Sequence, residues 1–188
     1  MKRNIFIEGE IKSGKSYVLN SILNILNLKY GGFLTFPFYQ NGLRVGFKIK
    51  DILTNEEEIC AIYNSDGNLI IFKDSFDDLG VRALDNALKN CELIVMDELG
   101  FMEEVSIKFK NKVKEVLNSD KNVICVIKEK KNEFLNEISS MGKIYKVSNK
   151  EKVEDEIVEE IKKWIFTKIW LKVWKVILKK RLLTLLLE

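Results

Sequence analysis

The chain has 188 residues, 46% of them hydrophobic and 31% charged, which suits one domain with a buried core and an appendage. It contains no histidine, so histidine catalysis and histidine zinc sites are excluded, and its three cysteines form no C-x-x-C pair. The net charge of +3 is uneven: residues 1–160 carry 23 basic and 27 acidic side chains, whereas residues 161–188 carry 8 and 1. Because the larger part is mildly acidic, we expect no nucleic-acid partner.

The cellular location is expected to be the cytoplasm. No signal peptide precedes the first apolar run, and scattered cysteines in odd number indicate a reducing compartment. Cys91 and Cys125 adjoin apolar runs, so we expect them to be small buried hydrophobes.

The first predicted elements are a strand, a loop and a helix. Residues 4–8 form an apolar run typical of a buried parallel strand, and residues 17–28 carry apolar positions at helical spacing. Between them, residues 9–16 read G-E-I-K-S-G-K-S and match the phosphate-binding pattern G-x-x-x-x-G-K-[ST]. In such a loop backbone N–H groups cradle phosphates, a lysine reaches the β- and γ-phosphates, and a hydroxyl ligates Mg²⁺. We therefore expect nucleotide contacts from Gly9, Glu10, Ile11, Lys12, Ser13, Gly14, Lys15, Ser16 and Tyr17, with Mg²⁺ on Ser16.

The next segment is predicted to be antiparallel β-structure. Strand-like residues 43–49 follow the turn signal Asn41-Gly42, and residues 59–63 and 69–72 flank a second turn signal at 64–67. These strands are expected to be inserted into a parallel sheet or added beside it.

Beyond them, helical and strand patterns alternate. The predicted helices are 76–89, 105–117 and 134–138, and the predicted strands are 93–96, 123–127 and 144–147. Such alternation predicts an α/β fold with a parallel sheet and right-handed crossovers.

Two acidic residues end the strand at 93–96. Asp97 and Glu98 would emerge at the carboxyl edge of the sheet, where open α/β sheets bind ligands. Asp97 is placed to reach Mg²⁺, and Glu98 to polarise a water for attack on a γ-phosphate.

Residues 97–103, D-E-L-G-F-M-E, resemble the D-E-[IL]-G-x-M-E signature of a nucleoside-triphosphatase family, described from thermophiles and known in animals as cancer-related nucleoside-triphosphatase. Residues 31–35 and 41–47 resemble the same family's G-G-F-x-T…G-x-R-x-G-F element. The resemblance covers residues 3–160. It implies a RecA-like P-loop fold and slow, Mg²⁺-dependent hydrolysis of ATP, GTP and other nucleoside triphosphates to diphosphates.

The resemblance also implies roles for single residues. Asp97 helps to hold Mg²⁺, Glu98 is the general base, and Thr35 either faces the γ-phosphate or is an ordinary strand threonine with a satisfied hydroxyl. Asn149 and Lys150 replace the family's base-contacting Asn-Arg pair, and a lysine cannot stack on a base as a guanidinium does. Two further departures are Phe-Pro-Phe at 36–38 and a lysine, Lys128, where a histidine is usual.

Alternative functions remain open at this level. A P-loop kinase would pass the γ-phosphate to an acceptor, and a nucleotide-gated binding module would bind without turnover. The scarcity of arginine disfavours a kinase, which often needs an arginine-rich lid, and it leaves open which residue neutralises transition-state charge. The arginines are Arg3, Arg44, Arg82 and Arg181, of which Arg44 lies within the family element.

Residues 161–188 are predicted to form a basic amphipathic helix appended to the domain of residues 1–160. Tryptophans and aliphatic residues dominate it, and lysines recur on one helix face at 168, 172, 175 and 179. The lysines interrupt every apolar run before the roughly 20 residues that a membrane span needs. Three partners remain open for this helix: its own domain, a second copy, or a membrane surface that would make the protein peripheral.

Overall fold

A computed structural model describes residues 3–10, 12–129 and 132–185; in the last helix it describes side chains beyond Thr167 only for Trp170 and Trp174. The strands are β1 (Asn4–Gly9), β2 (Tyr30–Gln40), β3 (Leu43–Asp51), β4 (Glu57–Tyr63), β5 (Leu69–Ile71), β6 (Leu93–Leu99), β7 (Asn122–Lys128) and β8 (Lys143–Lys146). The helices are α1 (Lys15–Leu26), α2 (Lys73–Ser75), α3 (Val81–Asn90), α4 (Ile107–Asn118), α5 (Glu133–Ser139) and α6 (Lys150–Leu185), with a π-helical turn η1 (Phe76–Gly80) and a 3₁₀ turn η2 (Met102–Val105).

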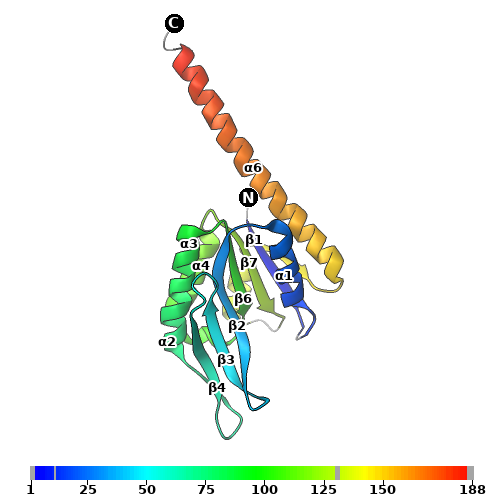
Figure 1. Ribbon diagram of the computed structural model, residues 1–188, viewed down its shortest axis with the longest axis vertical. Helices are drawn as coiled ribbons and strands as arrows, with labels where there is room; N and C mark the ends of the chain where they lie inside the picture. The colour runs from blue at the N-terminus through cyan, green and yellow to red at the C-terminus, as the bar shows by residue number, and fades with distance from the viewer. Residues whose placement is uncertain (1–2, 11, 130–131, 186–188) are drawn as a thin grey trace.

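All eight described strands form one mixed sheet in the order β5-β4-β3-β2-β6-β7-β1-β8 (Figure 1). Strands β2, β6, β7, β1 and β8 are parallel, and β3, β4 and β5 extend the sheet beyond β2 as an antiparallel meander. The predicted parallel sheet with added hairpin strands is therefore confirmed. The long connections of the parallel part carry helices, as parallel pairing requires.

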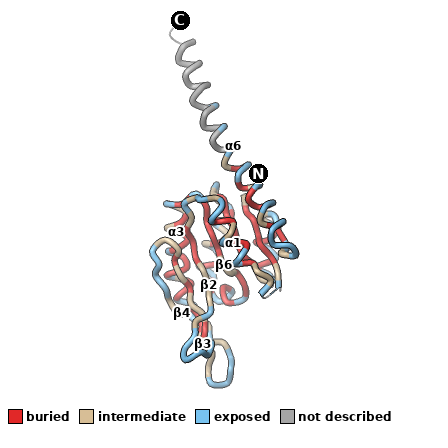
Figure 2. The backbone as a smooth tube through the Cα atoms, turned by 45° about the vertical axis from the view of Figure 1, so that its right-hand side comes forward, coloured by how far each residue is buried: buried red, intermediate tan, exposed pale blue. Residues whose placement is uncertain are grey.

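Helices cover both faces of the sheet. On one face α1 and the first part of α6 pack on Ile5 and Ile7 of β1. On the other face α3, α4 and α5 pack on a core that includes Phe6, Phe33 and Phe109. In Figure 2 the buried residues are concentrated in the central strands and in parts of the helices that cover them. The core thus fixes the carboxyl ends of β1, β6 and β7 relative to one another.

Gly32 shows why the Gly-Gly-Phe element begins β2. Its φ of +122° lies in the region that side chains rarely adopt, and a Cβ there would overlap the carbonyl oxygen of Val95 on β6. Glycine is therefore required for β2 and β6 to approach this closely.

Two helix starts differ from the sequence prediction. The helix predicted from residue 105 begins at Ile107, because the Ser106 hydroxyl accepts a hydrogen bond from the Phe109 N–H and caps the helix. Val105 is consequently exposed in the preceding 3₁₀ turn. The helix predicted from residue 76 starts earlier, with α2 at Lys73, passes through the π-helical turn η1, and is α-helical again from Val81. Hydrophobic spacing locates a helix but does not reveal its cap.

The last helix, α6, runs without a break across the predicted domain boundary at 160/161. Its buried residues Val153, Ile157, Ile161 and Trp164 pack beside α1, and the rest of the helix then projects past the body of the protein (Figure 1). Within the described residues, no helix combines the length and apolarity needed to cross a bilayer.

Candidate active site

The phosphate-binding loop lies where β1 ends and α1 begins. Lys12 and Gly14 have positive φ angles of 65° and 96°, which turn the loop back over the end of the strand. The Lys15 ammonium donates hydrogen bonds to the carbonyls of Gly9 and Glu10, both at 2.8 Å, and its side chain is only 7% exposed. The loop thus holds its lysine beneath it. Ile11, which we predicted to contact nucleotide, lies outside the described residues.

Other loop residues also adopt a tight arrangement. A Cβ at Gly9 would come within 2.6 Å of the Ser13 hydroxyl, which is buried and without a hydrogen-bond partner among the described residues. Ser16 and Tyr17 are exposed at the start of α1. The helix amino terminus therefore presents polar groups to the same side as the loop, as anion binding requires.

The acidic pair lies at the carboxyl end of β6. The pairing of β6 with β7 shifts register between Asp97 and Leu99, so Glu98 is the extra residue of a bulge. The Glu98 carboxylate lies 4.0 Å from the Lys15 ammonium. The structure therefore brings the predicted base to the phosphate-binding loop.

Asp97 is largely withdrawn from water. Burial is the main cause that raises the pKa of Asp97, the Glu98 charge adds to the increase, and Lys15 opposes both, so that the pKa is about 7. A nearby cation stabilises the ionised form of a carboxyl that is shielded from water. The described residues include no cluster of three or more His, Cys, Asp or Glu side chains suited to hold a metal by themselves.

Lys128 is part of the site, although the sequence marked it only as a departure from the family pattern. It ends β7, the strand between β1 and β6, and its ammonium lies 3.9 Å from the Glu98 carboxylate. It also lies 5.1 Å from the centroid of the Phe101 ring. Glu98 is thus flanked by two lysines. The signal that could have revealed this contact is the position of Lys128 at the end of the central strand.

A second carboxylate, Glu103, supports the loop that follows Glu98. Its Oε2 accepts a hydrogen bond of 2.7 Å from the Gly100 N–H, while the Asn132 amide donates to the Gly100 carbonyl at 3.1 Å. Glu103 is completely buried, and this burial raises its pKa to about 7. Both the N–H and the carbonyl of Gly100 are therefore hydrogen-bonded to side chains.

The residues predicted at the nucleotide base differ in their surroundings. The Lys150 ammonium lies 5.7 Å from the Tyr17 ring centroid, and the side chain of Lys150 covers Gly14. Asn149 instead caps α6, since its side-chain oxygen accepts from the Lys152 N–H at 3.2 Å. The structure brings Lys150 to the phosphate-binding loop and gives Asn149 a structural hydrogen bond.

Thr35 lies near the end of the parallel part of β2, one residue past Leu34, which pairs with Asp97. Its hydroxyl is buried and has no hydrogen-bond partner among the described residues. The alternative prediction, an ordinary strand threonine with a satisfied hydroxyl, therefore does not hold. A contact with the γ-phosphate stays a prediction.

The described arginines are engaged away from the loop. Arg44 donates to the Tyr63 hydroxyl at 2.9 Å and lies over the Phe47 and Tyr63 rings. Arg82 pairs with Glu56 at 2.8 Å, and Arg3 donates to the Asp120 carbonyl. The side chain of Arg181 lies outside the described part of α6. Lys15 and Lys128 are therefore the cations that the described residues place beside Glu98.

A phosphate-binding loop between strand and helix, with an acidic pair two strands away, defines a P-loop NTPase. The NTPase family model matches residues 4–162, and the chain belongs to this family. It is 38% identical over 167 residues to nucleoside-triphosphatase THEP1 of Methanocaldococcus jannaschii, with 84% of this chain and 96% of the relative covered. THEP1 of Thermotoga petrophila is 34% identical over 163 residues, with 84% and 89% covered.

Solved structures agree on the fold. THEP1 from Aquifex aeolicus matches with a TM-score of 0.65 and 24% identity, covering 84% of this chain and 96% of that one. A human cancer-related nucleoside triphosphatase matches with a TM-score of 0.68 and 22% identity, covering 85% and 97%. The family predicted from the sequence is confirmed.

Proposed function

We propose that the chain hydrolyses nucleoside triphosphates to diphosphate and phosphate, slowly, with Mg²⁺ and with broad base specificity. The observation that carries the proposal is the position of Glu98, a carboxylate at the end of β6 that lies between Lys15 of the phosphate-binding loop and Lys128. The names of the relatives support the substrate class.

Binding would begin with the phosphates. The backbone N–H groups of the loop and the amino terminus of α1 attract the anion. Lys15 would exchange the carbonyls of Gly9 and Glu10 for phosphate oxygens, which are stronger acceptors because they are charged. Substrate binding therefore replaces contacts that already hold the lysine in place.

The metal would be held by Ser16 and Asp97. When bound, Mg²⁺ neutralises phosphate charge and orients the phosphate chain. Asp97 suits this role because it is withdrawn from water beside Lys15.

Hydrolysis requires a base and a nucleophile. Glu98 would accept a proton from a water molecule as the water oxygen bonds to the γ-phosphorus and the bond to the β,γ-bridging oxygen breaks. The ion pairs with Lys15 and Lys128 would hold the Glu98 carboxylate beside the phosphate-binding loop, where it can accept this proton. The products are a nucleoside diphosphate and inorganic phosphate.

Lys128 also offers a positive charge where other P-loop enzymes use an arginine. An ammonium is a single point charge without the two-pronged geometry of a guanidinium, which is consistent with slow turnover.

Lys150 and Tyr17, next to Gly14, offer the nucleotide base a cation and a ring rather than a pattern of hydrogen bonds. Broad base specificity follows from such contacts.

The test is phosphate release from a panel of nucleoside triphosphates with Mg²⁺. We expect Lys15→Ala to lose both binding and turnover, and Glu98→Gln to keep binding while kcat falls about 10²- to 10⁴-fold. Glu104→Gln is the matched control, because Glu104 is exposed in the 3₁₀ turn η2 that follows β6 and should behave as the wild type. Phosphate release that depends strictly on an added acceptor would indicate a kinase, and binding without turnover would indicate a nucleotide-gated module. Normal hydrolysis by Glu98→Gln would show that Glu98 is not the base.

A further inference from the structure

The projecting half of α6 and the half that packs on the domain differ in which helix face carries apolar residues. In the first half, Val153, Ile157, Ile161 and Trp164 form the buried stripe, at successive spacings of four, four and three residues. The same spacing continues along the unbroken helix to positions 168, 172, 175 and 179, which are all lysine. Along the line of the buried stripe, the helix positions therefore change from apolar residues to lysines after Trp164.

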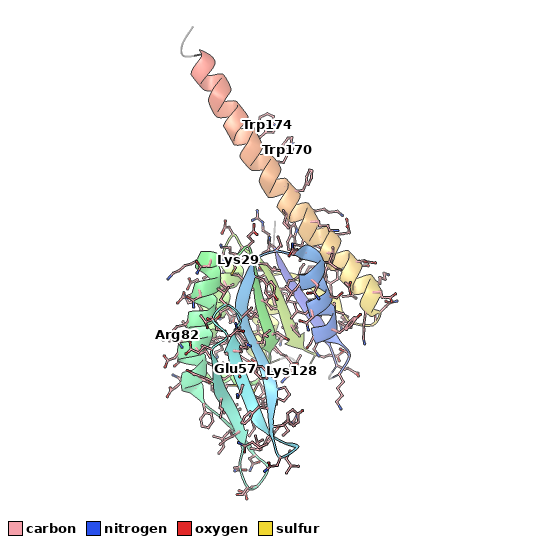
Figure 3. All side chains as sticks on the ribbon, in the orientation of Figure 1. Lys29, Glu57, Arg82, Lys128, Trp170 and Trp174 are labelled. Atoms are coloured by element: carbon pink, nitrogen blue, oxygen red, sulfur yellow. The ribbon has the colours of Figure 1, made fainter. Side chains whose placement is uncertain are left out.

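The described aromatic residues of the projecting half lie on the opposite side. Phe166, Trp170 and Trp174 recur every four residues, about 200° around the helix from the lysine positions. They are 74%, 57% and 46% exposed, and the two indole rings contact each other with centroids 5.8 Å apart. Figure 3 shows both tryptophans on the projecting helix, clear of the domain.

This reversal of the polar and apolar helix faces argues against the protein's own domain as the partner of the projecting half. A straight helix presents one face to one side, and the face directed at the domain carries lysines past Trp164. In the first half, the positions on the outer face are the exposed residues Asp155, Glu159 and Lys162. Polar and apolar faces are therefore reversed between the two halves, which a helix built to pack wholly on its own domain would not show.

The comparisons place this segment outside the family domain. The family match ends at residue 162, although the chain covers 96% of the Methanocaldococcus jannaschii relative. The projecting half is thus an addition to a complete NTPase domain, and its partner need not be part of the NTPase site.

We propose that residues 165–185 bind in the plane of an anionic membrane surface. A helix with aromatic and aliphatic residues on a wide face and lysines on the other is suited to the boundary between headgroups and acyl chains. Tryptophan prefers that boundary, and each lysine near an anionic surface strengthens binding about fivefold. The segment of about 30 Å would lie along the surface, with the catalytic domain held outside the lipid.

Charge also favours lipid over a second copy of the helix. Residues 161–187 contain 8 basic residues and no acidic one. If two such segments packed on each other, like charges would come close, and neither segment contains a carboxylate to pair with them. Anionic headgroups supply the opposite charge.

The experiment is flotation of the full chain with vesicles of phosphatidylcholine alone, or with about one third phosphatidylglycerol, followed by tryptophan emission. We expect binding to the anionic vesicles only, weakened by about 1 M NaCl, which shortens the Debye length to about 3 Å. The tryptophan emission should shift to the blue on binding, because the exposed rings of Trp170 and Trp174 would move from water into lipid. Trp164 is already buried and should contribute little to the shift.

The decisive variant is Phe166→Glu/Trp170→Glu/Trp174→Glu, which should bind anionic vesicles at least about tenfold more weakly. Ile107→Glu is the control, because Ile107 is 69% exposed on α4 and distant in sequence from the tail. Unchanged phosphate release by the triple variant would show that its domain is folded. The proposal is wrong if the wild type does not float, or if the triple variant floats equally well. It is also wrong if light scattering finds a wild-type dimer that the triple variant converts to a monomer without any vesicle binding.

Discussion

Glu103 offers the sharpest test of the energetics beneath the active site. It is completely buried, and its Oε1 has no hydrogen-bond partner among the described residues. Burial is the largest cause of its raised pKa; Glu98 adds to the increase, while its own N–H, the Gly100 N–H and Lys128 oppose it. The perturbation is Glu103→Gln, which keeps an acceptor for the Gly100 N–H and removes the ionisable group.

The magnitude follows from the two pKa values of this carboxyl. The pKa is 4.5 without the protein environment and about 7 in the folded state. Below the lower value both states hold the proton, and the wild type bears no cost. As pH rises toward 7 the unfolded chain releases its proton first, so the free energy of unfolding falls by about 1.4 kcal/mol per pH unit. The total loss is about 3 kcal/mol, complete once the pH exceeds the folded pKa.

The assay is urea unfolding of the wild type and Glu103→Gln at pH values from 4 to 8. The glutamine amide brings its own burial cost of about 1–3 kcal/mol, but that cost does not change with pH. The stability of Glu103→Gln relative to the wild type should therefore rise by about 3 kcal/mol across this range. Glu104→Gln, at an exposed neighbour, should show no such rise. A difference between Glu103→Gln and wild type that stays constant with pH would refute the reasoning.

Two further predictions concern the site and its sheet. Lys128→Met should lower kcat about 100-fold and change nucleotide binding much less, because it removes a cation that lies beside Glu98 and can stabilise transition-state charge. Nucleotide titration measures binding, and phosphate release measures kcat. Equal losses in binding and kcat would contradict this prediction. Gly32→Ala should lower the free energy of unfolding by about 3 kcal/mol or more, because its Cβ would overlap Val95. Gly42→Ala, at a positive φ with open space around it, should cost only about 1 kcal/mol in the same denaturant measurement, and similar losses at both sites would exclude the overlap as the cause.

Much of the fold could be predicted because its signals are local. The apolar runs that became β6 and β7 are short and continuous, and the loop between β1 and α1 has a fixed pattern of glycines. Helix starts were less predictable. The Ser106 cap and the π-helical turn η1 depend on hydrogen bonds, which hydrophobic periodicity does not record.

The sequence by itself determined the phosphate-binding loop, the acidic pair and the family, because these depend on residues that are neighbours in the chain. Only the tertiary structure decided which residues meet across strands. Lys128 reaches Glu98 because β7 lies between β1 and β6, and Glu103 becomes buried because its loop turns back to the Gly100 N–H. The tail shows the same division: its lysine spacing is visible in the chain, but only the packing of Trp164 on the domain reveals that the apolar face points away.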